Sequence, residues 1–399
     1  MNGVPEMNEE KKRILEMVEA GLISASEGLT LLEALDKEPS QQARKERRDN
    51  FFDELLNLGQ KLTGSGEKQS EQSHSQADSS VNQPKDKLFQ FVQSTVQKLK
   101  DFEFPLGKTV EFTHTFQEND FLPKRIKAET ASGSFTIKPW QENGVKAECQ
   151  IKMYGADSED EARESFIKNS VFYAREDKLS FSVGLKLMKV DTVLYVPEAA
   201  INNISVKLFN GSFSMRDMEV QDLEVKTANG KIEVKKSQVN EFEAETGNGQ
   251  VYFIDCEARK VEASSFNGAV HVVGSVGYTE IKSFNGNVLC DLKSDAAHTV
   301  KAQAVTGNIE IYVPEHMAMK GILRTNLGSL HLPETGLKKV TEKEEMVQKL
   351  IRFESEKETL GQVTIEAETK TGSVSVKTTA FHENDNSGDD EPPSIFEGK

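Results

Sequence analysis

Few residues of this chain have the types and spacing that metal or redox chemistry requires. The three cysteines, Cys149, Cys256 and Cys290, are odd in number and widely spaced, with no CxxC pair, and the seven histidines show no HxH or HExxH spacing. Zinc sites and disulfide frameworks depend on such pairs. Nor does a Walker or dinucleotide-binding motif occur between a predicted strand and helix. We therefore expect no metal and no cofactor, identify no small-molecule substrate, and expect Cys290 to be buried as a small apolar side chain.

Outward-facing carboxylates are the remaining candidates for catalysis, because glycoside hydrolysis uses two carboxylates on one exposed surface. Five glutamates fall at outward positions of the repeat described below: Glu233, Glu243, Glu262, Glu280 and Glu310. Five lysines are interspersed with them: Lys226, Lys231, Lys235, Lys282 and Lys301. This mixture is typical of a solvated, mixed-charge surface, so we predict no catalytic residues and a chain that is not an enzyme. A carbohydrate-active β-helix enzyme is the competing hypothesis.

A glycine-centred repeat organises residues 103–381. Segments such as FNGSF, ANGKI and GNGQV recur, and from residue 211 onward the glycines are 19, 19, 19, 18, 21, 21 and 44 residues apart. Fixed periods near 20 residues indicate stacked structural units. The structural turn glycines are Gly133, Gly211, Gly230, Gly249, Gly268, Gly286, Gly307, Gly328 and Gly372.

Alternation around each glycine predicts two short strands per repeat. The residues two and four positions after the nine glycines are all apolar, and in most repeats the residue three positions before is Thr or Ser. Alternation with a period of two on both sides of a turn places one face of each strand inward. Asn-Gly pairs suit turns that need a positive φ angle. The predicted fold is mainly β, a repetitive β-solenoid like a parallel β-helix, although alternation alone leaves parallel and antiparallel pairing open.

Two insertions interrupt the repeat. The segment SEDEARESF, after the first strand pair, is predicted to be a helix, and the charged segment near 334–360 is also predicted to be helical. LPETG, at residues 332–336, resembles the sortase sorting signal. In the register of the repeat, however, Leu332 takes an inward position, and LPE matches two other strand endings, YVPE at 195–198 and at 312–315. Proline ends strands because it lacks the ladder N–H, so we interpret LPETG as a strand ending.

The N-terminal part is predicted to be helical. Apolar residues at three-to-four-residue spacing make residues 1–38 a helical hairpin, which resembles the SHOCT oligomerisation module. A basic amphipathic helix follows at 39–62 and a second amphipathic helix at 85–102. Between them, residues 63–84 are rich in Gly, Ser and Gln and are predicted to be a disordered linker. Residues 382–399 are predicted to be a disordered acidic tail.

The two amphipathic helices carry the predicted contact with a membrane or a partner. Their apolar stripes and basic residues can lie on anionic lipid or pack on another helix, including a copy of the same chain. The residues concerned are Arg44, Lys45, Arg47, Arg48, Phe51, Phe52, Leu55, Leu56, Leu88, Phe91, Val92 and Leu99. Residues 41–102 hold ten Lys or Arg against nine Asp or Glu, whereas the whole chain has a formal net charge of -16.

Composition excludes some classes of function. A chain this acidic is not expected to bind nucleic acid, because it repels the phosphate backbone. No apolar stretch reaches the roughly 18 residues of a membrane-spanning helix, and the N-terminus has no signal-peptide pattern. The expected location is the cytoplasm with peripheral contact at the inner face of the membrane, and the alternative is the cell surface by an unrecognised export route.

The glycine repeats, the VPE endings and the inserted SEDEARESF helix resemble the bacterial "putative adhesin" family of β-solenoid domains, across residues 110 to 380. Together with the N-terminal hairpin, the order of parts is similar to the LiaX-type envelope-stress proteins. The resemblance implies a role in sensing or buffering envelope stress from membrane-active antimicrobials, and it supplies no catalytic residues. The hypothesis is a non-enzymatic accessory protein, and the alternative is a surface adhesin or antimicrobial-peptide binder.

Overall fold

The computed structural model describes residues 108–184, 187–345, 348–356 and 361–379. The chain divides into two units, 1–76 and 77–399, and every described residue belongs to the second. The predicted hairpin, amphipathic helices, linker and acidic tail lie outside the described residues, and so do the twelve predicted contact residues from Arg44 to Leu99.

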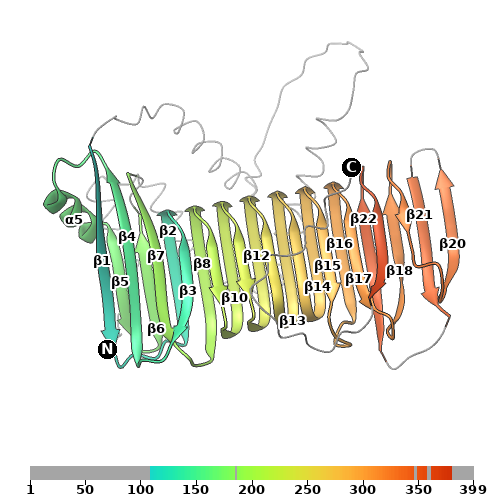
Figure 1. The fold of residues 1–399 in the computed structure, drawn as a ribbon, viewed down its shortest axis with the longest axis horizontal. Helices are drawn as coiled ribbons and strands as arrows, with labels where there is room; N and C mark the ends of the chain where they lie inside the picture. The colour runs from blue at the N-terminus through green and yellow to red at the C-terminus, as the bar shows by residue number, and fades with distance from the viewer. Residues whose placement is uncertain (1–107, 185–186, 346–347, 357–360, 380–399) are drawn as a thin grey trace, which may run out of the picture. The chain divides into compact units, whose positions relative to one another are not determined.

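The described residues form a β-solenoid with two faces, confirming the predicted fold class (Figure 1). In spatial order, face 1 comprises β5 (Ser170–Arg175), β6 (Lys178–Val183), β2 (Arg125–Ser132), β8 (Ile201–Asn210), β10 (Glu219–Asn229), β12 (Gln238–Asn248), the second parts of β13 (Val251–Asn267) and β14 (Val270–Asn285), β16 (Thr299–Thr306), β22 (Gln362–Thr369), β18 (Ala318–Thr325), β21 (Gln348–Ser355) and β20 (Leu337–Glu345).

Most strands of face 2 follow a glycine turn. It comprises β1 (Thr109–Asn119), β4 (Gly144–Tyr154), β7 (Met188–Pro197), β3 (Phe135–Trp140), β9 (Phe213–Arg216), β11 (Ile232–Lys235), the first parts of β13 and β14, β15 (Val288–Leu292), β17 (Ile309–Pro314), β23 (Val374–Thr379) and β19 (Leu330–His331). Within both faces the coils pair in parallel, and antiparallel pairing is confined to strands near the two ends.

Each coil that contains a repeat glycine has one strand on each face, joined at that glycine. Equivalent residues stack in register: Val206 pairs with Val225, and Val225 pairs with Ala244. These three side chains are buried, and the positions two and four residues after the glycines are buried in every coil except the last, where Leu330 and Leu332 are half-buried. The core therefore consists of columns of apolar side chains between the faces, as the alternation predicts.

Spatial order departs from chain order at both ends of the solenoid. The β6–β7 coil lies outside the earlier β2–β3 coil, because β2 pairs with both β6 and β8. At the other end, the β22–β23 coil inserts between β16–β17 and β18–β19, since Val374 pairs with both Ile309 and Leu330. The spacing of the repeat glycines along the sequence therefore does not determine which coils are neighbours.

One of the two predicted helical insertions is a helix. The helix α5 (Glu159–Lys168) begins at Ser158, whose Oγ accepts a 3.2 Å hydrogen bond from the Glu161 backbone N–H, and it buries Ala162 and Phe166 on one side. The helical prediction for the segment near 334–360 is wrong. That segment holds the antiparallel strands β20 and β21, in which Ile351 and Phe353 alternate into the core with the period of a strand.

Candidate functional site

The nine repeat glycines lie at the seam where face 1 turns into face 2. A Cβ built on Gly249 would lie 1.9 Å from the carbonyl oxygen of Gly230, and one on Gly211 would lie 1.8 Å from that of Gly133. No side chain fits at such distances, so the coils approach through bare backbone. A positive φ is recorded for three of the nine, Gly133, Gly230 and Gly268. Close backbone approach, rather than the φ angle we expected, is the shared requirement.

Two rows of hydrogen bonds run beside this seam. The hydroxyls of Thr227, Thr246, Ser265, Ser283, Thr325 and Thr369 donate to the carbonyl oxygen of the glycine in the adjacent coil, at 2.7 to 3.0 Å. An asparagine row lies one step nearer the turn, where Asn248 Nδ2 donates to Asn229 Oδ1 at 2.7 Å. These ladders tie neighbouring coils together, so the outward side chains occupy fixed rows.

The five outward glutamates are divided between the two faces and paired with lysines. Each lies within 3.2 Å of a lysine Nζ: Glu233 with Lys231 and Lys235, Glu243 with Lys226, Glu262 with Lys260, Glu280 with Lys282, and Glu310 with Lys377. Burial lowers the pKa of Lys226, but the carboxylates of Glu245, Glu243 and Glu224 outweigh it and the net pKa is raised. This is the mixed-charge surface that the sequence predicts.

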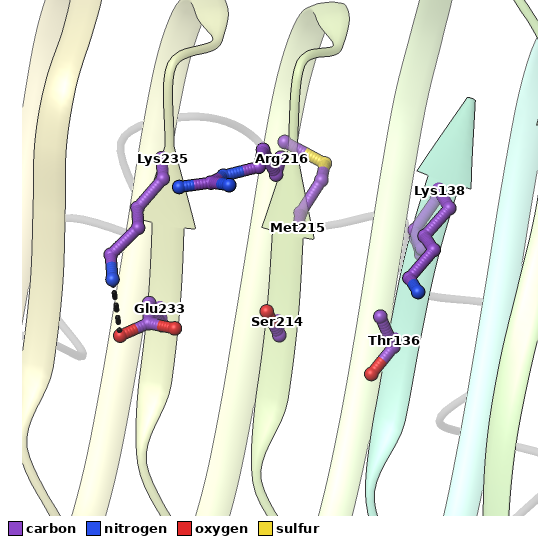
Figure 2. Close-up of a pocket in the computed structure, with 8 residues that line it drawn as sticks. Thr136, Lys138, Ser214, Met215, Arg216, Glu233 and Lys235 are labelled. Carbon is purple, nitrogen blue, oxygen red and sulfur yellow. Dashed lines mark ion pairs between the residues drawn. The ribbon is translucent and has the colours of Figure 1, made fainter. Parts of the chain in front are cut away.

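A pocket of about 340 Å³ opens on the outer surface of face 2, over β3, β9 and β11. Figure 2 shows Lys138, Arg216 and Lys235 in one row on these adjacent strands, with Thr136, Ser214 and Glu233 in the row beside it. The strand register creates both rows, because Thr136 pairs with Ser214, Ser214 with Glu233, and Arg216 with Lys235. The inward-pointing Ile137 and Met215 complete the lining.

The pocket carries three cationic side chains and one carboxylate. Glu233 lies 3.0 Å from Lys231 Nζ and 3.2 Å from Lys235 Nζ. Partial burial raises the pKa of Glu233, but hydrogen bonds and charge from these two lysines outweigh it and hold the pKa below its usual value. Glu233 is therefore ionised near neutral pH and already neutralised by its own lysines.

The remaining reactive side chains do not assemble a site. The three cysteines are free and buried, and burial raises the pKa of Cys149 to about 11 and those of Cys256 and Cys290 to about 12, which makes them poor nucleophiles. Among the described residues, no three His, Cys, Asp or Glu side chains come together as metal ligands. No helix in the described part of the chain is long and apolar enough to span a membrane.

Sequence reasoning singled out Lys235 and Glu233 but missed Lys138, Arg216, Thr136 and Ser214. The signal was present in the repeat, because these residues occupy the outward columns three and five positions after Gly133 and Gly211. The inward columns of the repeat establish the fold. The outward columns become informative once the coils are known to pair in parallel, since only then do equal positions become neighbours.

Comparisons with known proteins identify two regions of the chain. Residues 170–377 match the family model described as Toastrack DUF4097, and residues 9–40 match a SHOCT-like domain. The chain is 38% identical over 373 residues to the protein named "Uncharacterized protein YvlB" of Bacillus subtilis (strain 168), which covers 93% of this chain and 99% of that relative.

Solved structures with a similar arrangement include two from Parabacteroides species. One is named a "putative lipid binding protein" from Parabacteroides distasonis, with 14% identity, 67% of this chain and 96% of that chain covered, and a TM-score of 0.40. The other is named a "putative adhesin" from Parabacteroides merdae, with 11% identity, 68% and 98% coverage, and a TM-score of 0.34. At these TM-scores the likeness carries no argument about function. The family match and the Bacillus relative show that the chain belongs to the Toastrack DUF4097 family.

Proposed function

We propose that this protein is a non-enzymatic accessory of the envelope-stress response, in which the β-solenoid acts as a rigid binding scaffold. The observation that carries the proposal is the regular stacking of the coils. Ladder hydrogen bonds and the glycine seam hold outward side chains in rows, and one group of rows forms a cationic pocket. Stacked repeats commonly use such extended surfaces for binding.

The described core favours binding at the surface rather than inside the solenoid. The inward columns are filled by closely packed apolar side chains, among them Phe135, Phe213, Phe242 and Phe253, which are at most 1% exposed. Such an interior has no room for a ligand without displacing core side chains. A partner or ligand would therefore meet the outer rows of face 1 or face 2.

The N-terminal part would bring the scaffold to its place of action. In this proposal the SHOCT-like region mediates self-association or contact with a protein partner, and the basic and apolar residues between Arg44 and Leu99 contact a partner or the anionic inner face of the membrane. The match to the SHOCT-like model and the concentration of basic residues at 44–48 support this division of roles.

Deletion and localisation in the native bacterium test the proposal together. We expect loss of the protein to change, by at least about fourfold, the concentration of a membrane-active cationic peptide that inhibits growth. Complementation should restore the original value. We also expect protease added to intact cells to leave the full chain uncut, and lysis to release part of it with the membrane fraction. Unchanged susceptibility in the deletion strain would overturn the envelope role, and cleavage on intact cells would favour the surface alternative.

A further inference from the structure

The pocket on face 2 contains hydrogen-bond donors that the described protein does not use. Arg216 and Lys138 are exposed, and neither forms an ion pair within the described residues. The hydroxyls of Thr136 and Ser214, which lie in the adjoining row, make no hydrogen bond with any described residue. Elsewhere on this face the cations are engaged, as Lys377 is with Glu310 at 2.9 Å. Cationic and hydroxyl donors that have no acceptor among the described residues lie side by side here, and such a group of donors can bind an anion.

Electrostatics at the pocket oppose those of the whole chain. The chain has a formal net charge of -16, yet the pocket lining has three cations and one carboxylate, and that carboxylate is held by Lys231 and Lys235. The nearby Glu148 is paired with Lys146 at 2.9 Å; this hydrogen bond lowers the pKa of Glu148, and the charge of Lys138 contributes to the same shift. The exposed Asp217 follows Arg216 at the corner of the coil. Anions are therefore attracted to this position on an otherwise acidic protein.

The geometry suits a compact tetrahedral anion. Both rows cross the same strands, β3, β9 and β11, which lie about 4.8 Å apart, and along each strand the two rows are two residues apart. Donors therefore line the pocket from neighbouring strands at two levels. A guanidinium offers a planar fork that matches two phosphate oxygens, and an ammonium or hydroxyl can reach a third. Because filled coils close the pocket floor, only a head group can enter, and an attached chain must remain outside.

We propose that this pocket binds a phosphate group, with Arg216 and Lys138 as its charged ligands and Thr136 and Ser214 as hydroxyl donors. This inference rests on the proposed scaffold function and names the ligand class for one part of its surface. The same group can be presented by a free phosphate compound or by the head group of an anionic lipid.

The test uses the full chain and three probes at low ionic strength: inorganic phosphate, glycerol 1-phosphate, and phosphatidylglycerol vesicles compared with phosphatidylcholine vesicles. We expect Arg216→Gln to weaken binding about tenfold and Lys138→Gln about threefold, as loss of a charge-assisted bidentate contact should. Lys207→Gln is the matched control. It removes the same charge from the same coil, but from the exposed surface of face 1. Circular dichroism melting confirms that each variant is folded.

Each outcome has a defined meaning. Loss of binding to the soluble phosphates in Arg216→Gln supports a free phosphate compound as the ligand, and loss confined to phosphatidylglycerol vesicles supports a lipid-borne group. The inference is overturned if no probe binds the wild-type chain, or if Arg216→Gln and Lys207→Gln have equal effects. If the deletion strain shows an envelope phenotype but the pocket binds no phosphate probe, the proposed scaffold function is supported and the phosphate ligand is not. Phosphate binding without such a phenotype would support the phosphate ligand and overturn the envelope role.

Discussion

The hydroxyl of Thr246 donates a 3.0 Å hydrogen bond to the carbonyl oxygen of Gly230 in the neighbouring coil. The same contact recurs from Thr227 to Gly211 and from Thr369 to Gly307. It explains why a small hydroxyl residue stands three positions before most repeat glycines, since the strand carrying it must satisfy a carbonyl that the tight turn leaves free. The hydroxyl column and the glycine column of the repeat are therefore linked by hydrogen bonds in the structure.

Removing this hydroxyl should destabilise the solenoid only where it has a partner. We expect Thr246→Val to lower the free energy of unfolding by about 1 kcal/mol, because the half-buried Gly230 carbonyl loses its donor. The control is Thr130→Val at the equivalent position of the β2 coil, where the buried hydroxyl has no hydrogen-bond partner, so the change should be neutral or stabilising. Urea denaturation measures both, and equal losses would contradict the role assigned to the ladder.

A side chain at the seam should separate two coils. Gly249→Ala places a Cβ 1.9 Å from the Gly230 carbonyl oxygen, a backbone atom that cannot rotate away. We expect a loss of about 1–3 kcal/mol in the free energy of unfolding. Gly184→Ala serves as the control, because its Cβ would meet nothing within 4 Å, and its effect should stay within about 0.5 kcal/mol. Similar losses in the free energy of unfolding for the two variants would show that the backbone at the seam can shift to accommodate a Cβ.

Buried thiols should make the fold sensitive to alkaline pH. Burial raises the pKa of Cys290 from 9.0 to about 12, so the folded chain holds this proton more tightly than the unfolded chain. The resulting stability is fully present below pH 9 and is lost as the pH rises toward the folded pKa. Between pH 8 and pH 10.5, the wild type should lose about 2 kcal/mol more than Cys290→Ala. Chemical denaturation at the two pH values measures the difference, and parallel losses would refute it.

The basic amphipathic helix predicted at 39–62 is one of the two segments expected to contact the membrane. Replacing Phe51, Phe52, Leu55 and Leu56 with serine removes the first part of the apolar stripe while keeping the basic residues, and we expect sedimentation with anionic vesicles to be abolished. Replacing Leu88 and Phe91 in the second predicted helix is the comparison. If the four-serine variant still sediments like the wild type, the membrane role of this segment must be abandoned and a protein partner takes its place.

Local pattern predicted much of the fold because each coil repeats the same constraints. The columns that contain Val225, Ala244 and Ala263 identified the inward face, and these side chains are buried. The failure at β21 has a physical origin too. Its high charge suggested a solvated helix, but Ile351 and Phe353 pack into the core once β18 offers an edge for antiparallel pairing.

The sequence by itself determined the coil: its length, its two strands, its glycine seam and which side chains point inward, because these follow from a period of two and from close backbone approach. Only the tertiary structure decided the order of the coils and hence the pocket. Every coil has the same alternation, so local pattern cannot choose a coil's neighbours, and long connections let a coil cross to another position at little extra entropic cost. The placement of β3 against β9 brings Lys138 and Arg216 to one surface, although 78 residues separate them in the chain.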